Sequence, residues 1–367
     1  MSRPIRADQV GSLLRPDSLL RARQMAASGD ISAASLREQE DAAILQVLDK
    51  QRQIGLEILT DGEFRRASWI TDMADAVEGF VPQRRILEWR GRDGSNQAEA
   101  STSNVVGGRL KPRRRLTGDE TSFLKRHARG PIKMTLPAPS NFWVVSWKEG
   151  VSNAAYASRS DMLAHVVQIV RAEVEALVED GVDYIQLDAP FYGVFIDEQH
   201  RATLRHAGVD PDRALEEVVA ADNAVVEGLA REGLTFGLHI CRGNSRSRWL
   251  YEGAYDPIAD VLFSRLAVDT FLLEYDSSRD GGFEPLRFLP KGKIAVLGLV
   301  TSKEATLETV GDLRRRIQEA AAIVPLDQLA LSPQCGFASV AAGNALTEED
   351  QWRKLELVVK TGREVWG

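Results

Sequence analysis

The stretch LTFGLHIC at residues 234–241, followed by PIADVLFSRL at 257–266 and TFLLEYD at 270–276, decides the fold. Two nearly continuous apolar runs flank a segment with helical spacing. Uninterrupted apolar runs of this kind are typical of parallel strands that helices cover on both faces. We therefore predict a strand–helix–strand unit here and expect it to repeat along the chain.

The same alternation extends in both directions from this unit. Helical patterns cover residues 35–53, 160–179, 211–231, 303–322 and 347–365. Strand-like runs cover residues 5–10, 56–63, 131–137, 184–190, 234–241, 270–276, 293–300 and 328–333. Eight such units predict an α/β fold, a closed (β/α)8 TIM barrel that spans residues 1–367 as one domain. An open, doubly wound sheet is the alternative, but no Gly-x-Gly-x-x-Gly turn follows an early strand.

One segment interrupts the alternation. Residues 70–130, between the second and third strands, are too long for a simple loop and are rich in Gly, Ser, Asn and Arg. We expect an insertion of irregular structure or hairpins near the barrel mouth. Its basic run, RLKPRRR at 109–115, is either a solvated face or a docking strip for an anionic substrate.

Composition excludes several classes of protein. The chain has 44% hydrophobic and 27% charged residues and a net charge of −7, which argues against non-specific nucleic-acid binding. No apolar run reaches the roughly 18 residues that a membrane helix needs. The first residues, MSRPIR, lack the apolar core of a signal peptide, so we expect a cytoplasmic protein with no membrane partner. Oligomeric state is left open.

Both cysteines of the chain follow predicted strands. His239 and Cys241 are two residues apart, so their side chains point to the same side of one strand. Glu274 ends the next strand, and Cys335 follows the last strand. Strand ends converge on the carboxyl-terminal face of a barrel, and two thiolates, an imidazole and a carboxylate suit a tetrahedral Zn²⁺. Two buried core thiols are the alternative interpretation.

The motifs at these strand ends resemble a known family. They are VGSL at 10–13, DGEFR at 61–65, QLDAP at 186–190, HICRGN at 239–244, LEYD at 273–276 and SPQCG at 332–336. In this order they resemble the catalytic barrel of cobalamin-independent methionine synthase, especially its short single-barrel relatives, the 5-methyltetrahydropteroyltriglutamate–homocysteine methyltransferase-like proteins. The resemblance runs over nearly the whole chain and implies that His239, Cys241, Glu274 and Cys335 bind zinc.

The resemblance also implies a site for an amino-acid thiol, homocysteine. Gly11 and Ser12 match the loop that holds the substrate carboxylate, and Glu63 and Asp188 match the carboxylates that hold its ammonium. Helix capping is the alternative role for the two acids. Trp143 lies near the position where the family stacks the pterin ring of its methyl donor, although a core or lid aromatic is an equal alternative.

The expected reaction is zinc-dependent transfer of a methyl group to the homocysteine thiolate, which gives methionine. Zinc would favour the thiolate, Glu274 would be the replaceable ligand, and an acid must protonate the leaving nitrogen of the donor. Larger relatives carry a His after the seventh strand, where this chain has Lys303; we assign catalytic roles to Asp188 and Lys303. These relatives also have an N-terminal barrel that helps to hold the polyglutamate of folate, and the basic insertion around Arg113 could replace it.

Three functions therefore remain. The first is a homocysteine methyltransferase that uses 5-methyltetrahydrofolate, as its mono- or polyglutamate, or another methyl carrier. The second is a different zinc–thiol alkyltransferase of the epoxyalkane–coenzyme M type. Coenzyme M has a sulfonate and no ammonium, so Glu63 and Asp188 would repel it. The third is a non-catalytic zinc- or thiol-binding barrel, against which the weak ligand Glu274 argues.

Overall fold

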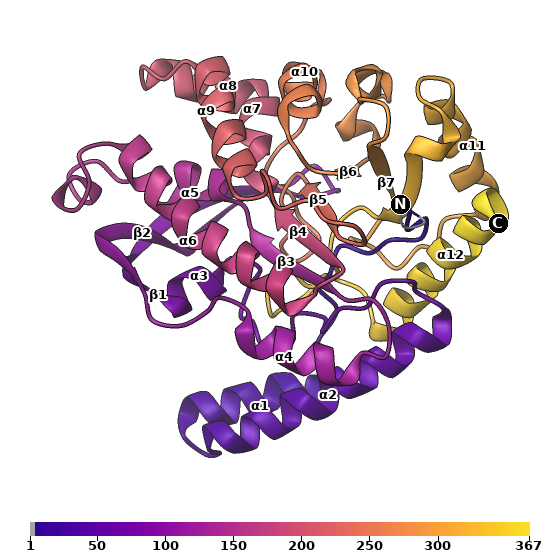
Figure 1. Cartoon of the computed structure of the whole chain (residues 1–367), viewed down its shortest axis with the longest axis horizontal. Coiled ribbons are helices and arrows are strands. Elements are labelled where there is room, and N and C mark those ends of the chain that lie inside the picture. The colour runs from indigo at the N-terminus through magenta and orange to yellow at the C-terminus, as the bar shows by residue number, and fades with distance from the viewer. Residues whose placement is uncertain (1–3) are drawn as a thin grey trace.

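A parallel sheet forms the centre of the computed structural model, which describes residues 4–367. Its strands lie in the order of the chain (Figure 1). Nearly every residue in them is buried. They are β3 (Lys133–Pro137), β4 (Tyr184–Asp188), β5 (Thr235–Ile240), β6 (Thr270–Glu274), β7 (Ile294–Val300) and β8 (Leu329–Pro333). Burial on both faces explains their continuous apolar sequences. The prediction of an α/β fold with a parallel, barrel-like sheet is confirmed.

The first two predicted strands are reduced to single bridges, so regular strands do not close the barrel. Ala7 pairs in parallel with Leu331 of β8, and Leu59 pairs in parallel with Ile132 beside β3. Side chains cross the gap between these two segments. The amide of Gln9 donates to the carbonyl of Ile58 at 2.9 Å. The prediction of eight regular strands is therefore wrong at residues 5–10 and 56–63, because side-chain bonds replace the backbone ladder there.

Helices surround the sheet, and their ends follow local sequence signals. Ser32 caps the helix that begins at Ala33, and Gly55 ends it at a left-handed φ of 87°, where glycine has no steric penalty. The α-helices are α1 (Asp17–Ser28), α2 (Ala33–Ile54), α3 (Thr71–Ala76), α4 (Gly118–His127), α5 (Pro139–Val145), α6 (Arg159–Asp180), α7 (Gly193–Ile196), α8 (Glu198–His206), α9 (Pro211–Ala224), α10 (Asp256–Arg265), α11 (Val310–Ala321) and α12 (Glu348–Trp366). Short 3₁₀ turns lie at Ser152–Ala154, Pro190–Tyr192, Ser278–Asp280, Glu284–Phe288 and Leu326–Gln328.

Residues 70–130 contain a long antiparallel hairpin. Its strands are β1 (Val77–Arg90) and β2 (Asn96–Pro112), with α3 before it and α4 after it (Figure 1). Several contacts hold the hairpin against the barrel. Among them, Arg90 forms a bridge with Trp249, which lies in the loop after β5, and Val106 donates from its backbone to the carbonyl of Ser146. The organisation of the chain as one domain with an insertion stays a prediction.

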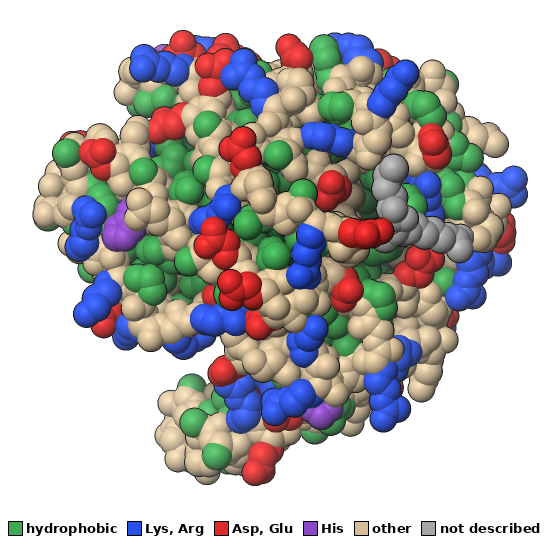
Figure 2. All heavy atoms as spheres, viewed as in Figure 1, with side chains coloured by type: hydrophobic (Ala, Val, Ile, Leu, Met, Phe, Trp, Pro, Cys, Tyr) green, Lys and Arg blue, Asp and Glu red, His purple; other side chains and the backbone are tan. Residues whose placement is uncertain are grey.

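The surface has mixed charge on the face that Figure 2 shows, where acidic and basic side chains alternate. Among residues 4–367, no helix has the length and apolar character that crossing a bilayer requires.

Candidate metal and substrate site

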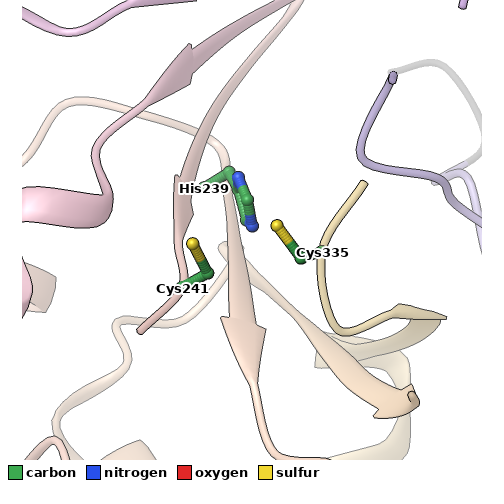
Figure 3. Close-up of side chains that lie close together, drawn as sticks. All are labelled: His239, Cys241 and Cys335. Carbon is green, nitrogen blue, oxygen red and sulfur yellow. The ribbon is translucent and has the colours of Figure 1, made fainter. Parts of the chain in front are cut away.

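Three of the predicted metal ligands meet at the carboxyl ends of β5 and β8. One donor atom from each of His239, Cys241 and Cys335 lies within 4.8 Å of the others, and all three residues are buried. His239 and Cys241 share one side of the same extended segment, while Cys335 comes from the loop after β8 (Figure 3). Both cysteines are free thiols. We call this set the three-ligand group.

The imidazole of His239 is oriented for a ligand. Its Nδ1 lies 3.0 Å from Oδ1 of Asp188, and its buried Nε2 has no hydrogen-bond partner. Asp188 is fixed in turn, because the amide of Gln186 donates to the same oxygen at 2.8 Å. A carboxylate at Nδ1 favours the tautomer whose Nε2 lone pair is free for a metal.

The electrostatics of the group suit a cation. Burial lowers the pKa of His239, but Asp188 and Cys335 outweigh burial and raise it to about 10. A hydrogen bond from Cys241, together with the charge of His239, lowers the pKa of Cys335 well below its usual range. The site thus favours a thiolate beside a positive charge. A metal ion would supply that charge in place of the imidazole proton, and an imidazole with two sulfurs is a donor set that suits zinc.

Glu274 lies next to the three-ligand group but outside it. Its carboxylate is fully buried; Oε2 accepts from the backbone of Arg242 at 2.8 Å, and Oε1 pairs with Arg279. Burial raises the pKa of Glu274, but Lys303, Arg279 and Arg242 outweigh it and lower the pKa. The carboxylate is therefore ionised and already has cationic partners. Its predicted role as the fourth metal ligand stays a prediction.

Three of the four expected thiol-substrate residues line one cavity with the three-ligand group. This cavity has a volume of about 420 Å³, and Ser12, Glu63 and Asp188 lie in its wall. Oε1 of Glu63 accepts from Thr135 at 2.9 Å, and its buried Oε2 has no partner. Burial, with a smaller contribution from Asp188, raises the pKa of Glu63 to about 7. A cationic group in the cavity would stabilise both carboxylates.

Gly11 is not among the lining residues, but its backbone packs closely against Glu63, which is. Its φ is 139°, and a Cβ there would lie 2.9 Å from the Thr135 side chain and 3.3 Å from Oε1 of Glu63. The loops of Ser12 and Cys335 also interlock. Phe337 donates from its backbone to the carbonyl of Ser12 at 2.9 Å, and a Cβ at Gly336 would lie 1.9 Å from the Ser12 hydroxyl.

Lys303 is buried close to Glu274 and is not among the residues that line the cavity. Its Nζ is 3.5 Å from the carbonyl of Gly243. In the amide orientation that satisfies all its neighbours, Gln334 accepts from Lys303 at 2.9 Å and donates to Glu274 at 2.9 Å. Lys303 therefore places a positive charge next to Glu274 and close to the thiols of Cys241 and Cys335.

The residues expected to bind the methyl donor lie outside the cavity wall. Nε1 of Trp143 donates to Glu217 at 3.1 Å, and Arg159 covers its ring with a guanidinium 4.3 Å from the centroid. Arg113 is exposed, with Glu78 at 3.8 Å. The position of Trp143 agrees with the alternative interpretation of a core aromatic.

Sequence reasoning missed the residues of the hairpin that do line the cavity. Arg85, Leu87 and Trp89 alternate along β1 and face it, and residues 99–104 of β2 complete this wall. The period of two in the sequence RILEW was the available signal. The composition of the insertion, rich in Gly, Ser, Asn and Arg, does not by itself report this alternation.

Comparison with known proteins identifies the family. The sequence-family model of the cobalamin-independent synthase catalytic domain matches residues 7–354. The chain belongs to this family. The family assignment agrees with the motifs at the strand ends and with the convergence of the three-ligand group.

Individual relatives cover nearly the whole chain. The uncharacterized protein YxjG of Bacillus subtilis is 38% identical to this chain, and the match covers 99% of this chain and 95% of YxjG. A methionine synthase of Pyrococcus abyssi is 26% identical over 89% of this chain and 85% of its own. Among solved structures, a B12-independent methionine synthase from Shewanella, in complex with selenomethionine, has a TM-score of 0.73 at 20% identity and covers 99% of this chain and 98% of its own. The last likeness supports the barrel-like fold.

Proposed function

We propose that the protein is a zinc-dependent S-methyltransferase that converts homocysteine to methionine. One observation carries the proposal: the three-ligand group and the carboxylates of Glu63 and Asp188 line the same cavity. A metal that binds sulfur and a pair of acids that bind an ammonium match the two ends of an amino-acid thiol. The family membership of the chain supports the same reaction.

His239, Cys241 and Cys335 would hold the zinc, and Glu274 is the candidate for an exchangeable fourth ligand. Bound zinc would lower the pKa of the substrate thiol, so that the thiolate is available at neutral pH. Asp188 holds the His239 ring through Nδ1. Glu63 and Asp188 would bind the ammonium, while Ser12 and the backbone at Gly11 would bind the carboxylate.

The chemical step transfers a methyl cation equivalent. The thiolate sulfur attacks the methyl carbon in line, the bond from that carbon to the donor breaks, and the donor keeps the electron pair. When the donor is a tertiary amine such as 5-methyltetrahydrofolate, its nitrogen leaves poorly, so an acid must give it a proton as the bond breaks. Lys303 lies outside the cavity wall, so we propose that it acts by compensating the charge of Glu274 and the thiolates.

The test combines metal content with turnover. The purified chain should hold about one zinc ion and form methionine from homocysteine with one of these donors: 5-methyltetrahydrofolate mono- or polyglutamate, methylcobalamin or S-methylmethionine. Cys335→Ser should lose both zinc and turnover. Full zinc retention in the Cys241→Ser, Cys335→Ser double variant would exclude the metal site. Alkylation of coenzyme M in place of homocysteine would favour the second function.

A further inference from the structure

The cavity has a second wall that the thiol substrate does not need. Hairpin strand β1 pairs with β2 so that Arg85 lies opposite Ser101 and Leu87 lies opposite Glu99. Arg85, Leu87 and Trp89 stand on the face of β1 that lines the cavity, together with the three-ligand group. The hairpin is thus part of the same site.

Arg85 is a cation without a partner in this wall. Within residues 4–367 its guanidinium has no hydrogen bond and no ion pair. Neighbouring arginines differ: Arg90 pairs with Asp197 at 3.0 Å, and Arg248 pairs with Glu99. A half-buried guanidinium offers five donors, so it favours a site where an anion can enter.

The surroundings of Arg85 restrict which substrate can supply that anion. Aromatic side chains of Trp69, Trp89, Phe191 and Tyr251 line the cavity around it, while the carboxylates of Glu63 and Asp188 lie in the wall that the three-ligand group shares. In the proposed function these acids and Ser12 already match the ammonium and carboxylate of the amino acid. Arg85 remains for the second substrate, which would have an aromatic body and an anionic end.

We propose that Arg85 is a specificity residue that binds a carboxylate of the methyl donor, so that the hairpin selects carboxylate-bearing donors over neutral ones. The inference rests on the proposed function, because it takes the cavity to hold a methyl donor beside the thiol. The anionic end of the donor would then contact the cavity face of β1 and not the basic run around Arg113. A bidentate contact from a guanidinium to a carboxylate is worth roughly 10- to 100-fold in affinity.

Equilibrium binding to the zinc-loaded full chain tests this role without requiring turnover. The probes are 5-methyltetrahydrofolate monoglutamate, its triglutamate and the neutral 5,6-dimethyltetrahydropterin, and quenching of tryptophan fluorescence reports binding. Arg85→Gln should weaken binding of both carboxylate probes by roughly 10-fold or more and leave the neutral pterin unchanged. Arg85→Lys should fall between the wild type and Arg85→Gln, because a lysine keeps the charge and loses the fork.

Arg84 supplies the matched control, since it is the adjacent arginine of β1, exposed and absent from the cavity wall. Arg84→Gln should bind every probe like the wild type. Each of three results would overturn the proposal. The first is equal folate affinity in Arg84→Gln and Arg85→Gln, and the second is a loss of affinity in Arg85→Gln that is as large for the neutral pterin as for the folates. The third is no folate binding to the wild type. If Arg85 discriminates between the probes but no donor gives methionine, the proposed function fails and the anion contact stands.

Discussion

Replacing Asp188 with Asn would show whether this carboxylate controls the metal site through His239. Oδ1 of Asp188 lies 3.0 Å from Nδ1 of His239, and Gln186 donates to the same oxygen at 2.8 Å. Asn keeps the size of the side chain and an oxygen that can accept both bonds. It removes the negative charge from a residue that is 5% exposed, where solvent screens little.

The expected loss of zinc affinity in Asp188→Asn follows from the removal of this charge. Partners of metal-bound histidines typically contribute 10- to 100-fold to metal affinity. Because the acceptor geometry survives in Asp188→Asn, we expect a loss near the lower end, about 10-fold, which corresponds to about 1.4 kcal/mol. If the proposed function holds, homocysteine binding should weaken further, because Asp188 lines the cavity and would be a counter-charge for the ammonium.

The assay is competition for zinc between the protein and a chromophoric chelator at neutral pH. Asp222→Asn is the control, since Asp222 is a buried carboxyl that bonds to Ser140 and Tyr192 and does not line the cavity. It should leave zinc affinity unchanged. Wild-type zinc affinity in Asp188→Asn would refute the coupling through His239, as would an equal loss in both variants.

Three further predictions concern stability. Burial raises the pKa of Asp222 from 3.8 to about 7, so the folded chain holds a proton that the unfolded chain releases, and stability falls as pH rises from about 4 through 7. Asp222→Asn should remove about 4 kcal/mol of this pH dependence in urea unfolding, and parallel pH profiles of the two proteins would contradict it. In zinc-free protein, Arg279→Met should lower the free energy of unfolding by about 3 kcal/mol, because the buried Glu274 loses a cationic partner. Adding Glu274→Gln to this variant should recover part of the loss. An unchanged urea midpoint in Arg279→Met would disprove the pairing. Gly298→Ala would put a Cβ 2.7 Å from two backbone atoms of neighbouring segments, so it should lower the free energy of unfolding by about 1–3 kcal/mol, as measured by thermal unfolding. In Gly311→Ala the new Cβ meets only one atom, at 3.7 Å, so Tm should stay unchanged or rise slightly. Equal Tm values for the two glycine variants would argue against the steric account.

The strand ends were predictable because period and position are local properties of the sequence. His239 and Cys241 follow from one strand, and the barrel geometry brings Cys335 to them. The first two strands could not be foreseen as single bridges. Polar side chains there, such as Gln9, form the bonds that a backbone ladder would otherwise make, and only the folded chain shows this exchange.

Long-range partners limited the rest of the site prediction. The position of Glu274 depends on Arg279, which a short turn folds back toward the end of β6, and no periodic pattern reports such a return. Trp143 was assigned to the methyl donor only by resemblance to the family, whereas its ring packs against Arg159 on α6. The cavity wall at Arg85 comes from a hairpin whose position depends on contacts with the loop after β5.

The interlocked loops of Ser12 and Cys335 have a thermodynamic consequence. Since Gly336 packs against the Ser12 hydroxyl and Phe337 bonds to its carbonyl, ordering one loop also orders the other. Occupancy of the metal position would therefore lower the entropy lost when the amino acid binds, and the amino acid would in turn slow the release of the metal. By reciprocity, any factor by which a bound metal raises the affinity for the amino acid equals the factor by which the amino acid raises the affinity for the metal, so the metal-free chain would bind the amino acid more weakly.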